Sequence, residues 1–459
     1  MKSYLISSTK KSSGKTIIAT GLCSILSNID SLAAFKKGPD YIDPLWLSQA
    51  SKAKCYNLDF FTMTDLEISK LYKTASRGKN ISIIEGNKGL FDGVSLNGID
   101  SNASLAHLLK LEVILVLDCS GITRGIAPLL QGYKGFDSKI KYKGIILNNI
   151  ASERHESKII NAVNEFTKFK VIGSVHKNKK LDIIEKSLGL EPVFQNTHTS
   201  KIIKNISSIV KSSIDIKYLV NKSISAKIKT IPKIVTKHKK YSNLKIGVAL
   251  DEAFGFYYPD DIDKFKSYGV KIVYFNTLKD KSLPEVDGLF IGGGFPERVT
   301  DRLHKNTSMI KSISSFIDSG MPVYAECGGL MYLCESIKVK ARKFKMAGII
   351  KGNVEMCDKP VGRGYVELMI NKKHPWMNKG DVIKCHEFHY SNIKIKNNSS
   401  SYGFKVIRGY GTNGRHDGIL YKNLVASYSH LRDTAQSRWI ENYLNFIYCI
   451  KNNETKTNI

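Results

Sequence analysis

The sequence has no long apolar run, no paired cysteine motif and no internal repeat. Its 459 residues contain nothing near the ~18 consecutive apolar residues of a membrane helix, and no signal-peptide core follows the N-terminus. We therefore expect a cytoplasmic protein without a membrane partner. The eight cysteines are scattered, with no C-x-x-C pair and no histidine cluster at zinc spacing, which argues against a disulfide framework and a structural zinc site.

Acidic residues are scarce relative to basic ones. The chain has 70 Lys and Arg against 41 Asp and Glu, a net charge of +29. Such a charge can serve nucleic acid, a membrane surface or an acidic substrate. Because the lysines are spread along the whole chain, we interpret most of them as a solvated surface. We expect no nucleic-acid partner, and a polyanionic small substrate is the alternative use of the charge.

Short apolar segments alternate with amphipathic ones in two series. This pattern predicts two α/β domains with parallel, helix-covered sheets, followed in the second by a section richer in β-structure. The first series runs to about residue 192, and the second begins at Leu244. The predicted strands are residues 3–7, 81–84, 113–118, 144–147, 170–172, 245–250, 271–275, 288–291, 322–325 and 425–428, and the main predicted helices are 15–26, 330–333 and 435–448.

The segment Thr9-Lys10-Lys11-Ser12-Ser13-Gly14-Lys15-Thr16 lies between the first predicted strand and helix. It matches a P-loop except that Thr9 replaces the first glycine. Backbone N–H groups of such a loop cradle phosphate oxygens at a helix N-terminus, while Lys15 supplies a cation and Thr16 a hydroxyl for Mg²⁺. The segment predicts an ATP site with Mg²⁺. The residues expected to bind ATP are Ser12, Ser13, Gly14, Lys15 and Thr16.

Carboxylates near predicted strand ends are candidates for the metal. Glu85 directly follows the strand 81–84, Asp92 lies in Gly-Leu-Phe-Asp-Gly, and Asp40 and Asp43 lie in an acidic corner. Four carboxylates placed together would be costly without Mg²⁺ or cationic partners. Each of them alone could equally be a turn or cap residue.

Cys327 is predicted to be a nucleophile. It lies between a predicted strand and an apolar helix, in Ala-Glu-Cys-Gly-Gly, the arrangement of a nucleophile elbow. We expect the helix N-terminus to lower the pKa of its thiol. The upstream loop of residues 292–297 can present N–H groups of Gly293 and Gly294 to an oxyanion. His430, at the end of a predicted strand, is the candidate general base.

His386 and His389 flank Glu387 at a spacing that is not H-E-x-x-H, so a zinc protease is excluded. At least one of them is expected to be structural, and both are kept as weak candidates for substrate contact.

Together these motifs resemble the cobyrinic acid a,c-diamide synthase family, over residues from about 5 to about 431. The order of the motifs carries the resemblance. The matching segments are FKKGPDYIDP at 35–44, NLD at 57–59, EGNKGLFDG at 85–93, LN at 147–148, DEAFGFYYP at 251–259, GGGFPE at 292–297, YAECGGLMYL at 324–333 and HEFHYS at 386–391.

The resemblance implies a synthetase domain similar to dethiobiotin synthetase and a class I glutamine amidotransferase domain. It implies that Cys327 and His430 release ammonia from glutamine, and that ATP activates the a and c acetate carboxylates of a polycarboxylate tetrapyrrole as acyl-phosphates. Thr16, Glu85 and Asp40 then hold the metal. By the same resemblance, the substrate and its second carboxylate are handled by Tyr41, Asp43 and Asp92.

The corresponding boundaries are residues 1–222 for the synthetase domain, 223–243 for a linker, 244–440 for the amidotransferase domain and 441–459 for a helix end and polar tail. A homodimer is a candidate assembly.

The tetrapyrrole can be of the cobyrinate or hydrogenobyrinate type, with siroheme or Ni-sirohydrochlorin as alternatives. A P-loop switch ATPase carrying a non-catalytic glutaminase-like domain is the alternative of another class, with Lys10 as its signature lysine.

Two departures from the family pattern are visible. Lys186-Ser187 stands where an Arg-His pair is common, and Arg432 stands where a second histidine is common. The triad carboxylate expected two residues after the general base is therefore absent at that position.

Overall fold

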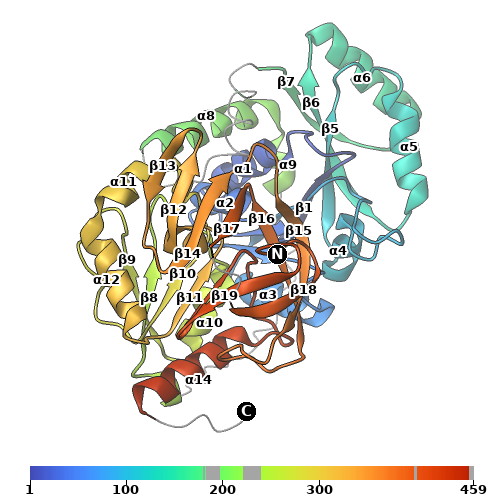
Figure 1. Cartoon of the computed structure of the whole chain (residues 1–459). Coiled ribbons are helices and arrows are strands. Elements are labelled where there is room, and N and C mark those ends of the chain that lie inside the picture. The colour runs from blue at the N-terminus through green and yellow to red at the C-terminus, as the bar shows by residue number, and fades with distance from the viewer. Residues whose placement is uncertain (179–180, 182–196, 221–238, 397–400, 454–459) are drawn as a thin grey trace. The chain divides into compact units, whose positions relative to one another are not determined.

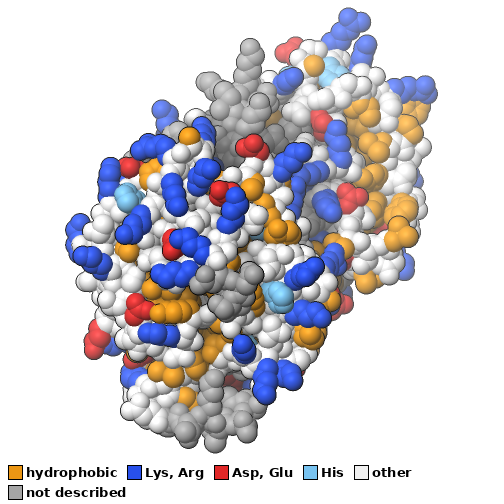
Figure 2. Space-filling view, viewed as in Figure 1, with side chains coloured by type: hydrophobic (Ala, Val, Ile, Leu, Met, Phe, Trp, Pro, Cys, Tyr) orange, Lys and Arg blue, Asp and Glu red, His pale blue; other side chains and the backbone are white. Residues whose placement is uncertain are grey.

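The computed structural model describes residues 1–178, 181, 197–220, 239–396 and 401–453. The chain divides into two compact units, Met1–Pro232 and Lys233–Ile459 (Figure 1). Lys and Arg side chains are scattered over the visible face rather than gathered in one patch (Figure 2). No helix of the described residues has both the length and the apolar character needed to cross a membrane.

The first unit contains a seven-stranded sheet in the order β3-β2-β4-β1-β5-β6-β7, and every recorded pair in it is parallel. Its strands are β1 (Lys2–Ser8), β2 (Leu32–Lys37), β3 (Cys55–Leu58), β4 (Ile81–Glu85), β5 (Glu112–Asp118), β6 (Lys141–Ile150) and β7 (Val171–His176). The described helices are α1 (Lys15–Leu26), α2 (Ile42–Ser51), α3 (Asp65–Ala75), α4 (Asn102–Leu109), α5 (Ile126–Phe136), α6 (Glu153–Phe166), α8 (Thr197–Ser213) and α9 (Ile216–Val220).

Helices cover this sheet, so its strand interiors are apolar, as residues 113–117 of β5 illustrate. Strand β2 leads into the acidic corner of Asp40 and Asp43, and its last two residues, Lys36 and Lys37, are charged although buried. The chain order reverses around β1, which pairs with β4 on one side and β5 on the other. In open α/β sheets, ligands bind at the carboxyl ends of the strands at such a point.

The helix after β1 packs closely on the last long helix of this unit. A Cβ on Gly21 of α1 would lie 2.5 Å from Cγ2 of Val210 in α8. Glycine therefore permits α1 and α8 to pack this closely. The packing fixes the position of α1, which directly follows the loop after β1.

The second unit contains a nine-stranded sheet in the order β16-β15-β18-β19-β20-β11-β10-β8-β9 and a four-stranded sheet, β13-β12-β14-β17. The strands are β8 (Lys245–Ala249), β9 (Lys271–Phe275), β10 (Gly288–Ile291), β11 (Val323–Glu326), β12 (Cys334–Val339), β13 (Arg342–Lys345), β14 (Ile350–Met356), β15 (Gly362–Ile370), β16 (Val382–His389), β17 (Ser391–Ile395), β18 (Ser401–Arg408), β19 (His416–Tyr421) and β20 (Leu424–Ser427). The helices are η1 (Lys239–Tyr241), α10 (Pro259–Ser267), η2 (Pro296–Arg298), α11 (Thr300–Lys305), α12 (Thr307–Asp318), α13 (Gly328–Leu333) and α14 (Trp439–Lys451).

The larger sheet of this unit is parallel from β9 to β20 and antiparallel beyond. One face carries an aromatic core around Trp439, whose ring packs on Phe290 and Tyr324. Its Nε1 donates to Oδ2 of Asp261 (3.1 Å). This core packs against β10 and against β11, the strand that leads to Cys327.

The C-terminal helix begins later than predicted, at Trp439 rather than 435. Arg438 directly before it has a left-handed backbone, with φ 41°. The hydroxyl of Ser437 donates to the carbonyl of Arg432 (2.5 Å) and accepts from the N–H of Thr434 (3.1 Å), which stabilises a turn in place of helix.

The predicted linker, residues 223–243, lies mostly outside the described residues. Its last part forms η1, where Tyr241 is buried and packs edge-on against Tyr268 and Tyr448. Tyr241 thus belongs to the core of the second unit.

Candidate active sites

The phosphate loop joins β1 to α1, as its residue pattern predicts. Gly14 takes a left-handed conformation, with φ 84°. Nδ2 of Asn148, in β6, donates to the carbonyl of Ser13 (3.1 Å), and a Cβ on Gly14 would lie 2.2 Å from that nitrogen. Position 14 therefore requires glycine for both its backbone and its closeness to Asn148.

Lys15 turns back toward β1. Its Nζ donates to Oγ of Ser8 (2.8 Å) and to the carbonyl of Lys10 (3.3 Å). Burial, and next the ammonium of Lys36, lower the pKa of Lys15 to about 8. A bound phosphate would supply the anionic partner that this buried cation needs.

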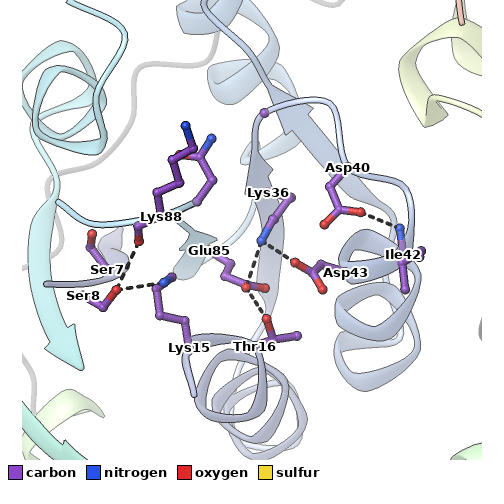
Figure 3. A network of polar contacts seen from close by, with 12 residues as sticks. Ser7, Ser8, Lys15, Thr16, Lys36, Asp40, Ile42, Asp43, Glu85 and Lys88 are labelled. Carbon is purple, nitrogen blue, oxygen red and sulfur yellow. Dashed lines mark hydrogen bonds and ion pairs between the residues drawn. The ribbon is translucent and has the colours of Figure 1, made fainter. Parts of the chain in front are cut away.

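A buried polar cluster lies beside the loop (Figure 3). The hydroxyl of Thr16 donates to Oε1 of Glu85 (2.7 Å), and Nζ of Lys36 lies 2.9 Å from the same oxygen. That ammonium also lies 2.5 Å from Oδ2 of Asp43. Oε2 of Glu85 is buried without a hydrogen-bond partner in the described part of the chain. Burial raises the pKa of Glu85, although Lys36 opposes this. Lys36 thus joins two carboxylates at a position that sequence reasoning missed.

Asp40 lies at the edge of this cluster. Its Oδ1 accepts from the backbone N–H of Ile42 (2.8 Å). Burial, and next the carboxylate of Asp43, raise the pKa of Asp40 well above its usual range. Tyr41 is buried at the N-terminus of α2. The structure thus links Asp40 to Asp43, and links Asp43 to Glu85 through Lys36.

Asp92 and Lys10 lie on loops around the same strand ends. Asp92 accepts from the N–H of Gly89 (2.9 Å) and closes a turn. Lys10 forms an ion pair with Asp118 at 2.9 Å. Burial acts to raise the pKa of Asp118, but hydrogen bonds from Asn149 and Lys10 outweigh it and lower the pKa to about 2.

Two buried asparagines hold the loops of this site. Nδ2 of Asn57 donates to the carbonyls of Gly38 (2.8 Å) and Asp40 (2.7 Å). Nδ2 of Asn102 donates to the carbonyls of Asn87 (2.5 Å) and Gly89 (2.8 Å). Asn57 falls within a family motif, whereas Asn102 is in none of the quoted segments and its role required the structure.

In the second unit, Cys327 forms the predicted elbow between β11 and α13. Its backbone has φ 47° and ψ −101°, a strained conformation for a residue with a side chain. A Cβ on Gly329 would lie 2.2 Å from the carbonyl oxygen of Ile291, and one on Gly328 would lie 3.0 Å from the nitrogen of Gly294. The two glycines allow the elbow to contact the loop after β10, where Gly293 and Gly294 lie.

The prediction that the helix N-terminus lowers the pKa of the thiol is wrong for this structure. Burial, and next the carboxylate of Glu297, raise the pKa of Cys327, and the N–H of Gly328 opposes them only in part. The thiol is directed at the carbonyl of Phe388, 3.9 Å away. Burial outweighs the hydrogen bond from the N–H of Gly328 at the helix N-terminus, so ionisation of the thiol requires a base.

His430 is close to a carboxylate that sequence reasoning missed. Its Nδ1 lies 3.3 Å from Oε2 of Glu326. Oε1 of Glu326 accepts from the hydroxyl of Tyr324 (2.7 Å) and the N–H of Leu431 (2.8 Å). The carboxylate that lies beside His430 is therefore that of the residue before Cys327, and not one two residues after the histidine. His430 also packs against the loop after β10, because a Cβ on Gly293 would lie 2.4 Å from its Cε1.

The weaker candidates, His386 and His389, are both buried. The rings of His386 and His430 stack with centroids 4.9 Å apart, and Nδ1 of His386 lies 3.1 Å from the hydroxyl of Tyr258. Burial, and next His430, lower the pKa of His386 well below its usual range, so its ring is neutral. The ring of His389 stacks on Tyr428 at 3.8 Å. His386 therefore packs against the flank of the candidate base.

Asp417 positions the segment that leads to His430. This fully buried carboxylate accepts from the hydroxyl of Ser427 (2.7 Å) and from the N–H groups of Tyr428 (3.0 Å) and Ser429 (2.9 Å). The carbonyl of Ser427 in turn accepts from the N–H of Cys327 (2.7 Å). The candidate nucleophile and base are thus fixed by one shared strand pairing.

Arg432, the departure from the family pattern, has a structural place. Its Nη2 lies 2.8 Å from Oδ2 of Asp260, and its guanidinium lies over the ring of Tyr258 at 4.6 Å. It is buried and connects the segment after His430 to α10. The other departure, Lys186-Ser187, lies outside the described residues.

Two known domain families match this chain. The profile of a CobQ/CobB/MinD/ParA nucleotide binding domain matches residues 4–190, and that of a CobB/CobQ-like glutamine amidotransferase domain matches residues 245–436. Cobyrinate a,c-diamide synthase of Magnetococcus marinus is 38% identical over 95% of this chain and 94% of its own. The chain belongs to the cobyrinate a,c-diamide synthase family.

Other members of the cobyrinate a,c-diamide synthase family show the same extent of similarity. The enzyme so named from Picrophilus torridus is 37% identical over 98% of this chain and 99% of its own, and that of Methanobrevibacter smithii is 37% identical over 93% and 94%. Among solved structures, PurLQS from Thermotoga maritima matches 44% of this chain and 99% of its own at 17% identity, with a TM-score of 0.35.

The predicted fold class is confirmed, with an N-terminal nucleotide-binding domain on a parallel sheet and a C-terminal glutamine amidotransferase domain. The predicted enzyme class is confirmed as well: the protein is a glutamine-hydrolysing ligase that uses ATP. The switch ATPase is no longer needed to explain the P-loop.

Proposed function

We propose that the protein amidates the a and c acetate carboxylates of cobyrinate, with ATP as activator and glutamine as ammonia donor. One observation carries the proposal: the same chain holds a phosphate loop beside the Thr16–Glu85 pair and a Cys327 elbow beside the His430–Glu326 pair. The names of the similar proteins support cobyrinate as the acceptor. The assigned boundaries are 1–222 for the synthetase domain and 244–440 for the amidotransferase domain.

In the glutaminase half, His430 takes the thiol proton of Cys327 as the sulfur attacks the side-chain amide carbon of glutamine. Glu326 stabilises the imidazolium that forms, in the way that a triad carboxylate does. N–H groups of Gly293 and Gly294 stabilise the oxyanion. The carbon–nitrogen bond breaks, His430 returns the proton to the leaving ammonia, and water then cleaves the thioester to glutamate.

In the synthetase half, Mg²⁺ fits the residues present, because the buried Oε2 of Glu85 has no partner in the described part of the chain. Glu85, the hydroxyl of Thr16 and Asp40 would hold the ion, which neutralises charge on the phosphates that it binds. Lys15 then binds the β- and γ-phosphates. Lys36 is the cation best placed to counter the charge of the phosphorylated carboxylate.

The acceptor carboxylate attacks the γ-phosphorus of ATP, and ADP leaves. Ammonia then attacks the acyl carbon, the amide bond forms and phosphate departs with the electron pair of the broken carbon–oxygen bond. We assign Tyr41, Asp43 and Asp92 to this acceptor side. Asp43 already faces Lys36, so it is the first of the three to test.

The test is amidation of cobyrinate by the purified protein with ATP, Mg²⁺ and glutamine, followed by mass spectrometry. Each amidation replaces a hydroxyl with an amino group, so two successive small mass decreases are expected. Siroheme and Ni-sirohydrochlorin are offered in parallel. Amidation of one of them, but not of cobyrinate, would reassign the acceptor.

The control for the ammonia site is Cys327→Ala. This variant should lose amidation with glutamine and keep amidation with an ammonium salt, because only the donor half is damaged. Continued use of glutamine by Cys327→Ala would refute the role assigned to this cysteine.

A further inference from the structure

Glu297 lies on the loop that packs against the elbow of Cys327. It is the last residue of the motif Gly-Gly-Gly-Phe-Pro-Glu and the middle residue of η2, the short turn after β10. This turn packs on α13, where a Cβ on Gly328 would lie 2.9 Å from Cδ of Pro296. The loop that carries Glu297 therefore comes close to Gly328, the residue directly after Cys327.

The carboxylate of Glu297 forms no close ion pair among the described residues, and Arg298 acts on it only at longer range. It is half-buried, yet no ion pair joins it to a basic side chain within the part of the chain that the structure describes. The neighbouring guanidinium of Arg298 lies over the ring of Phe295, at 4.9 Å. By contrast, Glu252 is paired with Arg302, and Glu355 with Lys394 at 2.7 Å. A carboxylate that loses water without a partner is costly, so a cationic ligand would stabilise it.

Its negative charge also acts on the nucleophile. After burial, the carboxylate of Glu297 is the next cause that raises the pKa of the Cys327 thiol. Burial likewise raises the pKa of Glu297 itself to about 7. An anion beside a thiol that must ionise hinders the reaction unless the ligand neutralises it. The residue therefore fits a substrate that brings a positive charge.

Glutamine brings such a charge. Its α-ammonium is joined to the reacting amide carbon by a short carbon chain. A carboxylate on the loop that packs against the elbow can therefore bind the ammonium while the thiol attacks the amide carbon. The α-carboxylate of glutamine does not compete for this position, because two carboxylates repel. Only the ammonium end offers charge complementarity to Glu297.

We propose that Glu297 binds the α-ammonium group of glutamine and thereby holds the side-chain amide at Cys327. Binding neutralises the carboxylate and so favours the thiolate at the moment when substrate is present. Glu297 is then the residue that distinguishes glutamine from amides without an α-amino group. This inference rests on the proposed hydrolysis of glutamine at Cys327, and does not depend on which tetrapyrrole is amidated.

The test compares glutamine with 4-carbamoylbutanoate, which lacks the α-amino group, as substrates for hydrolysis by the full-length protein. The wild type should prefer glutamine strongly. Glu297→Gln should lower kcat/KM for glutamine by roughly 10- to 100-fold, the range for loss of a charge-assisted hydrogen bond. It should lower kcat/KM for 4-carbamoylbutanoate much less, so the preference collapses.

Glu355→Gln is the matched control, because it removes a carboxylate from β14 of the same unit, where its partner is Lys394. It should keep the preference. Amidation with an ammonium salt reports whether Glu297→Gln has a folded synthetase domain, and thermal unfolding reports on the whole chain. If Glu297→Gln does not fold, Glu297→Asp replaces it, with a reduced but measurable preference expected.

A Glu297→Gln protein that prefers glutamine as strongly as the wild type overturns the proposal. A wild type that hydrolyses both amides equally also overturns it, whatever the variants do. If instead the proposed amidation of a tetrapyrrole is wrong, the result is different: glutamine is hydrolysed, but no tetrapyrrole is amidated.

Discussion

Nδ1 of His430 lies 3.3 Å from Oε2 of Glu326, the residue that directly precedes Cys327 in the chain. The candidate nucleophile therefore directly follows β11, whose last residue is Glu326, while the candidate base lies three residues after β20. The parallel pairing of β11 with β20 aligns Glu326 with Ser427 and brings the two segments together.

Glu326→Gln should lower kcat for glutamine hydrolysis by roughly 10²- to 10⁴-fold, because an amide cannot stabilise the imidazolium of His430 and can hold the wrong tautomer. Steady-state hydrolysis of glutamine measures this effect. Glu326→Asp, which keeps the charge, should recover part of the rate. A glutaminase rate within a few-fold of wild type in Glu326→Gln would exclude the triad role.

Lys36→Met should make the protein depend on Mg²⁺ for stability. Without this ammonium, the carboxylates of Glu85 and Asp43 lose the cation that both contact, at 2.9 Å and 2.5 Å. A divalent cation can replace it, so Mg²⁺ should raise the Tm of Lys36→Met by more than it raises that of wild type. The measurement is thermal unfolding with and without Mg²⁺. Equal shifts for the two proteins would contradict a metal site at Glu85.

ATP binding should be coupled to proton uptake at alkaline pH through Lys15. Burial, and next Lys36, lower the pKa of Lys15 to about 8 in the free protein, and pairing with phosphate raises it in the complex. ATP affinity should therefore be constant below pH 8 and fall as the pH rises through 8, toward about tenfold per pH unit.

Calorimetry in buffers of different ionisation enthalpy measures this proton uptake. Lys15→Arg is the control, because guanidinium remains protonated across the range and its binding should show no such fall. A wild-type affinity that is unchanged up to pH 9.5 would show that Lys15 is fully protonated without ATP.

Arg432→Met should destabilise the protein by about 3–5 kcal/mol, the typical cost when one partner of a buried ion pair is removed. The guanidinium is buried against Asp260 and Tyr258, so its loss leaves a carboxylate unpaired. Urea unfolding of the single variant and of Arg432→Met/Asp260→Leu measures the effect. The double variant should be the more stable of the two, and the opposite order would deny that the pair is coupled.

Local patterns in the sequence were sufficient for much of the fold and for the placement of the P-loop and of Cys327 between a strand and a helix. The P-loop, the Cys327 elbow and most of the parallel strands depend on residues close together in the chain, where apolar periodicity and glycines report directly on conformation. The start of the last helix was wrong because a side-chain turn, rather than helix propensity, decides residues 434–438.

Only the tertiary structure decided which groups contact the site residues and how readily the thiol ionises. Glu326 contacts His430 across 104 positions of the chain, and Lys36 joins carboxylates from two other segments. Such contacts follow from strand order and register, which no local pattern encodes. The pKa of the Cys327 thiol could not be predicted for the same reason. The helix start that lowers this pKa is visible in the sequence, but burial by distant segments raises it by more.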